Sequence, residues 1–249
     1  MQDQIPTSLP TTGSDAAALS QMGFSHMIQH LDVVGWIVLI TLVVMSLMSW
    51  FYIISNAVRN SAVRARADKV IAGFWGSNST QEAIQFMEAQ PKNEPFSKIA
   101  LECAEAAAHH AKQESGGGRM VEVLNRSEFI DRSLRQAVSR ESGRLETGLT
   151  LLATVGSSAP FIGLLGTVWG IYRALIAIGA SGKADIGSIA GPVGEALIMT
   201  AIGLFCAIPA LLAYNFFVRS NRVVLSKFDE FAHDLHDYFA TGARVGSGK

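Results

Sequence analysis

The sequence predicts an all-α membrane protein with three transmembrane helices and long cytoplasmic helical extensions. Three long runs carry no charge: residues 33–58, 147–172 and 186–218, the last interrupted only by Glu195. Each run exceeds the roughly 20 apolar residues needed to cross a hydrocarbon core about 30 Å thick. The composition agrees, since 49% of the 249 residues are hydrophobic and the mean hydropathy is +0.28. The net charge of −1 argues against a nucleic-acid-binding protein.

Residues 1–32 are predicted to form an N-terminal tail, and residues 33–54 the first transmembrane helix. The tail contains Pro, Ser, Thr and Gln but no Lys or Arg, so it lacks the positive region of a signal peptide. Trp36 and Trp50 lie near the two ends of the span, where interfacial aromatic residues are enriched. The span has no Gly-x-x-x-Gly pattern, and we expect it to face lipid.

Residues that bind metals are sparse in the sequence. His26 and His30 have the i, i+4 spacing of a helical metal site, but no third ligand accompanies them, so a solvated pair is the simpler interpretation. Cys103 lies in a polar segment and Cys206 in an apolar one, without the spacing of a metal site or a disulfide. We therefore predict no metal and no cofactor.

Positive charge follows the first span at once and indicates its orientation. Residues 55–146 contain thirteen Lys and Arg residues, beginning with Arg59, Arg64 and Arg66. An excess of Lys and Arg marks the cytoplasmic side of a membrane. We therefore predict that residues 55–146 form a cytoplasmic helical domain and that the N-terminus lies outside.

Capping and breaker residues divide this cytoplasmic domain into four predicted helices. A capping-box pattern at 79–82, Pro91 after the second helix, Pro95 in the first turn of the third and a Gly triplet at 116–118 provide the boundaries. The predicted helices are one continuing from the membrane to about Trp75, one after Ser79 ending before Pro91, one from Pro95 to about Gln113, and one from about Arg119. No breaker follows the last of these, so we expect it to enter the membrane as one helix with the second span.

The second span, residues 147–178, is predicted to pack closely against another helix. Small residues and a proline recur in it every three or four positions: Gly156, Pro160, Gly163, Thr167 and Gly170. Such a stripe lets helix backbones approach each other in a membrane. The Gly-rich run does not have the spacing of a phosphate-binding loop. Residues 179–190 are predicted to be a short polar link on the outside.

The third span, residues 191–217, carries a second stripe of small residues. Ala196, Thr200, Gly203 and Ala207 recur at the same spacing. Two such stripes predict close packing of spans two and three, with each other or around the axis of an oligomer. Residues 218–249 are predicted to continue as a cytoplasmic helix.

Glu195 is the leading candidate functional residue. A carboxylate within an apolar span costs roughly 2.5–3.5 kcal/mol on insertion scales, and no Lys or Arg lies in the same span to neutralise it. A proton on the carboxyl group or a water-filled passage removes this cost, and each involves proton handling. Thr167 and Thr200 are candidate lining residues of such a passage. The alternative is a structural hydrogen bond between packed helices.

Two segments closely resemble the ExbB/TolQ/MotA family of proton-channel proteins, in its ExbB and TolQ branch. They are SSAPFIGLLGTVWGI (157–171) and AGPVGEALIMTAIGLFCAIPALLAYN (190–215). The resemblance implies that Glu195 is the third-span Glu of that branch, Thr167 the Thr of its G-T-V-W-G motif, and Thr200 the Thr that follows the Glu.

The resemblance also implies an assembly and partners. A homopentamer in the bacterial inner membrane, with periplasmic N-termini, is expected to form a central pore lined by spans two and three. This pore would hold the transmembrane helices of an ExbD-like partner, whose membrane Asp takes up protons. Proton flow would then energise TonB, which opens outer-membrane receptors for iron chelates and cobalamin.

Several alternatives remain open on the sequence. Within the branch, the N-terminal tail favours an ExbB-like over a TolQ-like role in envelope maintenance, and a MotA-like stator would have four spans. A passive pore or secondary transporter would be expected to have more polar groups and an inverted repeat. A structural scaffold would need the small-residue stripes but not Glu195. An enzyme is the weakest alternative, because no nucleophile, base or set of metal ligands converges.

Overall fold

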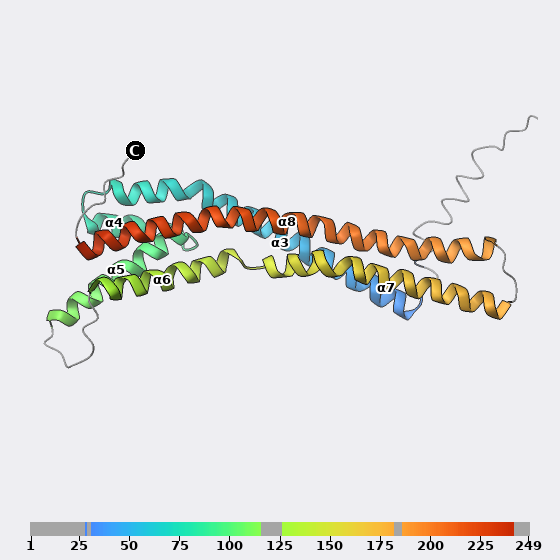
Figure 1. Cartoon of the computed structure of the whole chain (residues 1–249). Coiled ribbons are helices and arrows are strands. Elements are labelled where there is room, and N and C mark those ends of the chain that lie inside the picture. The colour runs from blue at the N-terminus through green and yellow to red at the C-terminus, as the bar shows by residue number, and fades with distance from the viewer. Residues whose placement is uncertain (1–27, 29–30, 116–125, 182–185, 242–249) are drawn as a thin grey trace, which may run out of the picture. The chain divides into compact units, whose positions relative to one another are not determined.

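The structure, a computed structural model, is all-helical over the residues that it describes, which are 28, 31–115, 126–181 and 186–241. Three of its helices are long and apolar enough to cross a membrane, so the predicted all-helical class with three candidate spans is confirmed. The described residues form the helices α3 (Val33–Gly76), α4 (Thr80–Glu88), α5 (Pro95–Ser115), α6 (Arg126–Leu145), α7 (Leu149–Ser181) and α8 (Ile186–Thr241) (Figure 1).

Local capping chemistry places the helix boundaries where the sequence predicts them. The Ser79 hydroxyl accepts a hydrogen bond from the Glu82 backbone N–H at 3.2 Å, and the Glu82 carboxylate accepts one from the Asn78 N–H at 2.8 Å. The capping-box pattern thus starts α4 as predicted, although the carboxylate bonds the N–H of the residue before the N-cap, Ser79, and not that of Ser79 itself. Pro95 opens α5, where its missing N–H costs nothing. The predicted helix start near Arg119 lies outside the described residues.

The prediction of one unbroken helix from the cytoplasmic domain into the second span is wrong. A turn at residues 146–148 separates α6 from α7. Gly148 adopts φ +85° there, a left-handed conformation that glycine takes without strain. A Cβ atom at Gly148 would also overlap the ring of Tyr52. The glycine thus acts as a breaker through its conformation and close contact, neither of which the helical periodicity indicates.

Side chains from two other helices satisfy the carbonyl groups that this turn frees. Arg59 of α3 and Asn221 of α8 donate to the Leu145 carbonyl at 3.1 and 2.9 Å. Asn56 of α3 donates to the Thr147 carbonyl at 3.3 Å. A helix end carries unpaired carbonyls, and burying them unpaired is costly. The interruption is therefore stabilised by hydrogen bonds and by the positive charge of Arg59 near a helix C-terminus.

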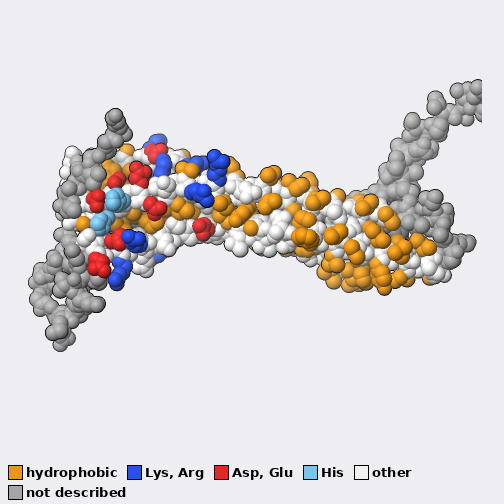
Figure 2. All heavy atoms as spheres, in the orientation of Figure 1, with side chains coloured by type: hydrophobic (Ala, Val, Ile, Leu, Met, Phe, Trp, Pro, Cys, Tyr) orange, Lys and Arg blue, Asp and Glu red, His pale blue; other side chains and the backbone are white. Residues whose placement is uncertain are grey.

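The chain divides into two compact units, each described here by itself. The first comprises residues 1–50 and 151–212, and the second comprises residues 51–150 and 213–249. The second unit has an aromatic and aliphatic core in which Phe96 packs edge-to-face on Phe228, with ring centroids 4.9 Å apart. Charged side chains of both signs are scattered over its visible surface in Figure 2. This is the surface expected of a domain in water.

The first unit has an apolar exterior, which appears orange in Figure 2. Along α3, Ile37, Ile40 and Leu47 are exposed, whereas Val38 and Leu42 are buried. The exposed residues suit contact with hydrocarbon. The first span therefore has one face available to lipid and another packed against protein.

Candidate functional site

Helices α7 and α8 touch backbone to backbone at two glycines. A Cβ atom on Gly163 would lie 2.7 Å from the Met199 carbonyl oxygen and 3.1 Å from the Thr200 Cα. A Cβ atom on Gly203 would lie 2.7 Å from the Ala159 carbonyl oxygen. No side chain fits into such a contact without moving a helix. The two small-residue stripes thus meet within one chain.

The close contact extends along both helices. A Cβ atom on Gly170 would approach the Ala196 Cβ to 2.9 Å, and one on Gly156 would approach the Leu211 backbone to 3.3 Å. Close packing over this length gives membrane helices their main attraction, because apolar surface gains little by leaving lipid for protein. The contact therefore fixes the register of α8 on α7.

Helix α3 joins this pair through positions outside the two predicted stripes of small residues. A Cβ atom on Gly166 would meet Met199 at 3.0 Å and the Val38 side chain of α3 at 3.1 Å. Gly166 lies between Gly163 and Gly170 at helical spacing, so the pattern was visible. Pro160 lies inside α7 and is half-buried, and Ala207 of α8 is buried.

The two candidate threonines lie on the contacting side of their helices. Thr167 is 5% exposed and donates to the Leu164 carbonyl of its own helix at 2.7 Å, the bond that a packing role predicts. Thr200 is half-buried, with its Cα at the Gly163 contact. Glu195 lies in α8, one residue before buried Ala196. The environment of its carboxyl group lies outside the described residues.

A further polar cluster, at the start of α3, was not predicted. Asp32 accepts a hydrogen bond from the Gly35 N–H at 2.9 Å, which caps α3. Its other carboxylate oxygen accepts from the Trp169 indole N–H of α7 at 2.8 Å, and Arg173 lies 3.4 Å away. The Asp32 carboxylate therefore links α3 to α7 by hydrogen bonds. Its place directly before an apolar run is the signal that could have identified it as a cap.

The Asp32 cluster favours the charged carboxylate. Partial burial alone would raise the pKa of Asp32, but the hydrogen bonds from Gly35 and Trp169 and the charge of Arg173 hold it below its usual value. The stabilisation is therefore present at neutral pH and is lost as the pH falls through the lowered pKa. The pair with Arg173 adds little, because the Arg173 side chain is 48% exposed.

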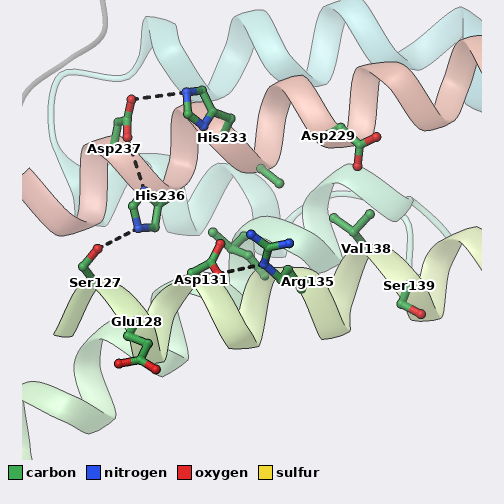
Figure 3. Close-up of a pocket in the computed structure, with 12 residues that line it drawn as sticks. Ser127, Glu128, Asp131, Arg135, Val138, Ser139, Asp229, His233, His236 and Asp237 are labelled. Atoms are coloured by element: carbon green, nitrogen blue, oxygen red, sulfur yellow. Dashed lines mark hydrogen bonds and ion pairs between the residues drawn. The ribbon is translucent and has the colours of Figure 1, made fainter. Parts of the chain in front are cut away.

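A cleft lined by two histidines lies in the second unit, between α6 and α8, with a volume of about 780 Å³ (Figure 3). His236 contacts the Ser127 hydroxyl at 2.9 Å and the Asp237 carboxylate at 3.3 Å, and His233 lies 3.7 Å from the same carboxylate. These groups do not converge on one point. Among the described residues, no group of three His, Cys, Asp or Glu side chains is arranged to hold a metal ion.

Comparison with known proteins gives a consistent result. Residues 99–230 match the MotA/TolQ/ExbB proton channel family. The chain is 57% identical to the biopolymer transport protein ExbB of Xanthomonas campestris pv. campestris over 98% of this chain and 99% of that protein. It is 37% identical to ExbB of Neisseria meningitidis, over 80% and 89%. It is 32% identical to the Tol-Pal system protein TolQ of Pseudomonas aeruginosa, over 84% and 91%.

Replacing Gly163 with Leu is expected to separate α7 from α8. The Cβ atom of the new leucine would lie 2.7 Å from the Met199 carbonyl oxygen, which is part of the α8 backbone and cannot move aside on its own. Size-exclusion chromatography and thermal unfolding of the detergent-solubilised protein measure the effect, with loss of the native assembly as the expected result. Gly179→Leu is the matched control, since a Cβ atom there meets nothing within 4 Å. An assembly that survives Gly163→Leu as well as Gly179→Leu would contradict the observed contact.

Replacing Asp32 with Ala is expected to destabilise the first unit by roughly 0.5–2 kcal/mol, the usual cost of a lost helix cap. Asp32→Asn keeps one acceptor oxygen and should lose less. Thermal unfolding in detergent at neutral pH measures both changes, with exposed Glu88→Ala as the control. Equal melting temperatures for wild type and Asp32→Ala would show that the hydrogen bonds of Asp32 do not stabilise the first unit.

Proposed function

Because the chain belongs to the MotA/TolQ/ExbB proton channel family, it is a transport protein rather than an enzyme, and we propose that it serves as the ExbB-like subunit of a motor driven by the proton motive force. With an ExbD-like partner, it energises TonB for outer-membrane uptake of iron chelates and cobalamin. The observation that carries this proposal is 57% identity to an ExbB over nearly the whole chain. The lower identity to TolQ, 32%, supports the ExbB-like over the TolQ-like role.

The proposed topology places the N-terminal tail, residues 1–32, in the periplasm and the chain in the inner membrane. Residues 55–146 and 218–249 then lie in the cytoplasm, and residues 179–190 form the periplasmic link. The support is the density of Lys and Arg after the first span. The described residues from 179 to 181 and from 186 to 190 are helical, so much of this link continues the two helices.

The proposed assembly is a homopentamer whose central pore is lined by α7 and α8. Both helices keep large exposed side chains outside their mutual contact, including Phe161 and Leu165 on α7 and Phe205 and Ile208 on α8. This apolar surface suits contact with neighbouring copies and with membrane lipid. The transmembrane helices of the ExbD-like partner occupy the pore in this proposal.

In the proposed mechanism, Glu195 provides the titratable group on the chain's side of the proton path. A carboxyl group in an apolar span exchanges between a neutral form suited to hydrocarbon and a charged form that requires water or a donor. Thr167 and Thr200 supply hydroxyl groups at the adjacent α7–α8 contact. The support is the position of the two threonines on the contacting sides of α7 and α8 and the absence of any Lys or Arg in residues 186–218 of the sequence. The membrane Asp of the partner completes the path.

Glu195→Gln is expected to reduce energy-dependent uptake of an iron chelate to the level of a strain lacking the protein. Glutamine keeps the size and hydrogen-bonding capacity of the side chain but does not release a proton. Transport of a radiolabelled iron chelate in a complemented deletion strain measures this, with exposed Glu230→Gln on the same helix as control. Wild-type uptake by Glu195→Gln would exclude the proposed proton role. Normal uptake combined with a leaky envelope in the deletion strain would favour the TolQ-like alternative.

The double change Thr167→Val, Thr200→Val is expected to impair uptake severely, with either single change milder. Valine keeps the shape of threonine and removes the hydroxyl, so packing at the glycine contact is preserved. The yield of assembled protein should therefore equal that of wild type. If the double variant transports at the wild-type rate, the Thr167 hydroxyl serves only the Leu164 carbonyl to which it is bonded.

A further inference from the structure

Three buried asparagine side chains gather in the second unit, where α3 and α8 meet the α6–α7 turn. Asn56 and Asn60 of α3 are 3% and 6% exposed, and Asn221 of α8 is 3% exposed. A buried amide group loses its hydrogen bonds to water, so its donors and acceptors are nearly always paired with other groups. Each oxygen and nitrogen of these three amides therefore requires a partner.

The amide of Asn56 is fully paired within the protein. Its Nδ2 group donates to the Tyr52 and Thr147 carbonyls at 2.8 and 3.3 Å. Its Oδ1 atom accepts a hydrogen bond from the Arg59 guanidinium. Asn56 thus needs no further ligand.

The amide of Asn60 has one acceptor without a protein partner. Asn60 Nδ2 donates to Asn221 Oδ1 at 2.7 Å, and Asn221 Nδ2 donates in turn to the Leu145 carbonyl at 2.9 Å. The Asn60 Oδ1 atom at the end of this chain is buried, and none of the described residues donates to it. Leaving such an acceptor unpaired costs the full desolvation of the group.

The direction of the chain fixes which atom needs a ligand. If the Asn60 amide were turned over about its Cβ–Cγ bond, its oxygen would face the Asn221 oxygen. If both amides were turned over, the Asn221 oxygen would face the Leu145 carbonyl oxygen. Either change brings two acceptors together, and neither has a proton to share. The unpaired atom is therefore an oxygen, and its ligand must offer a hydrogen-bond donor or a positive charge.

The surroundings favour water over a metal cation. The Arg59 guanidinium already brings a positive charge into the cluster, where it donates to Asn56 Oδ1 and to the Leu145 carbonyl. A calcium ion takes about six to eight oxygen ligands, but the Leu145 and Thr147 carbonyls are engaged by side-chain donors. A buried water needs only about two to four polar partners, and it can donate to Asn60 Oδ1.

Solvent has a short route to this cluster. A cleft of about 1060 Å³ between α3 and α6 is lined by Arg59, Leu145 and Thr147, which all bond directly to the asparagines. Asn60 also lies about 9 Å past the predicted end of the first span at Ile54, at 1.5 Å per residue. The site is therefore next to water and outside the predicted span.

We propose that Asn60 Oδ1 binds one buried water molecule, which completes the hydrogen-bond chain that runs through Asn221 to the Leu145 carbonyl. The water thereby becomes part of the junction of α3, α8 and the α6–α7 turn. This assignment rests on neither proton transport nor Glu195.

Water-edited solid-state NMR of the full chain in lipid bilayers tests the proposal, with ¹³C and ¹⁵N labels on asparagine. Magnetisation from water should reach the Asn60 side-chain amide at the mixing times at which it reaches exposed Asn78, and several times faster than it reaches Asn56. Asn56 is the matched control, because it is the same residue type on the same helix, equally buried and fully paired. The sequence has a single Arg–Asn pair, Arg59–Asn60, so the Asn60 signals can be assigned without a variant.

The possible outcomes separate one bound water from the other arrangements. Transfer to Asn60 that is as slow as transfer to Asn56 would overturn the proposal, since the acceptor would then be dry. Fast transfer to both side chains would also overturn it, because the whole cluster would then be hydrated. Replacing sodium and potassium in the buffer with choline should leave the Asn60 Cγ chemical shift unchanged, and a change would identify a metal cation as the ligand instead of water.

Discussion

The close approach of α7 and α8 at Gly163 and Gly203 is the constraint on which the arrangement of the candidate site depends. A Cβ atom at either glycine would lie 2.7 Å from a carbonyl oxygen of the other helix. In a membrane this contact replaces the hydrophobic driving force of a soluble core, because dispersion contacts accumulate only where backbones can meet. It sets which face of α8 is turned to α7 and therefore where Thr167 and Thr200 lie. The position of Glu195 along α8 follows from the same register.

Hydrogen bonds from polar side chains fix contacts between helices that apolar packing alone does not specify. In the first unit, one carboxylate, Asp32, caps α3 and binds the indole of Trp169 on α7. In the second unit, Arg59 and Asn221 bind the Leu145 carbonyl that the α6–α7 turn leaves free. In both places, a side chain satisfies backbone or indole groups that would be costly to leave unpaired. The packing of small residues thus gives proximity, and these hydrogen bonds give each unit a specific arrangement.

The helical class, the three candidate spans and most helix boundaries were predictable because they depend on local patterns. Hydrophobic run length predicts α3, α7 and α8, and the Ser79–Glu82 capping box predicts the start of α4. The turn at Gly148 was not predictable, since it depends on a left-handed backbone beside Tyr52 rather than on a run of breakers. The Asp32–Trp169 bond joins residues 137 positions apart and has no local signature. The proton role of Glu195 stays a prediction from its isolation in an apolar span.

The contact between Gly163 and Gly203 can be measured directly by solid-state NMR of the protein in lipid, with ¹³Cα labels on its 23 glycines alone. A Gly163–Gly203 cross-peak is expected, assigned by its disappearance in Gly163→Ala. It should persist when labelled protein is diluted into unlabelled protein, because the contact lies within one chain. A cross-peak that is absent, or that vanishes on dilution, would contradict the packing of α7 on α8 described here.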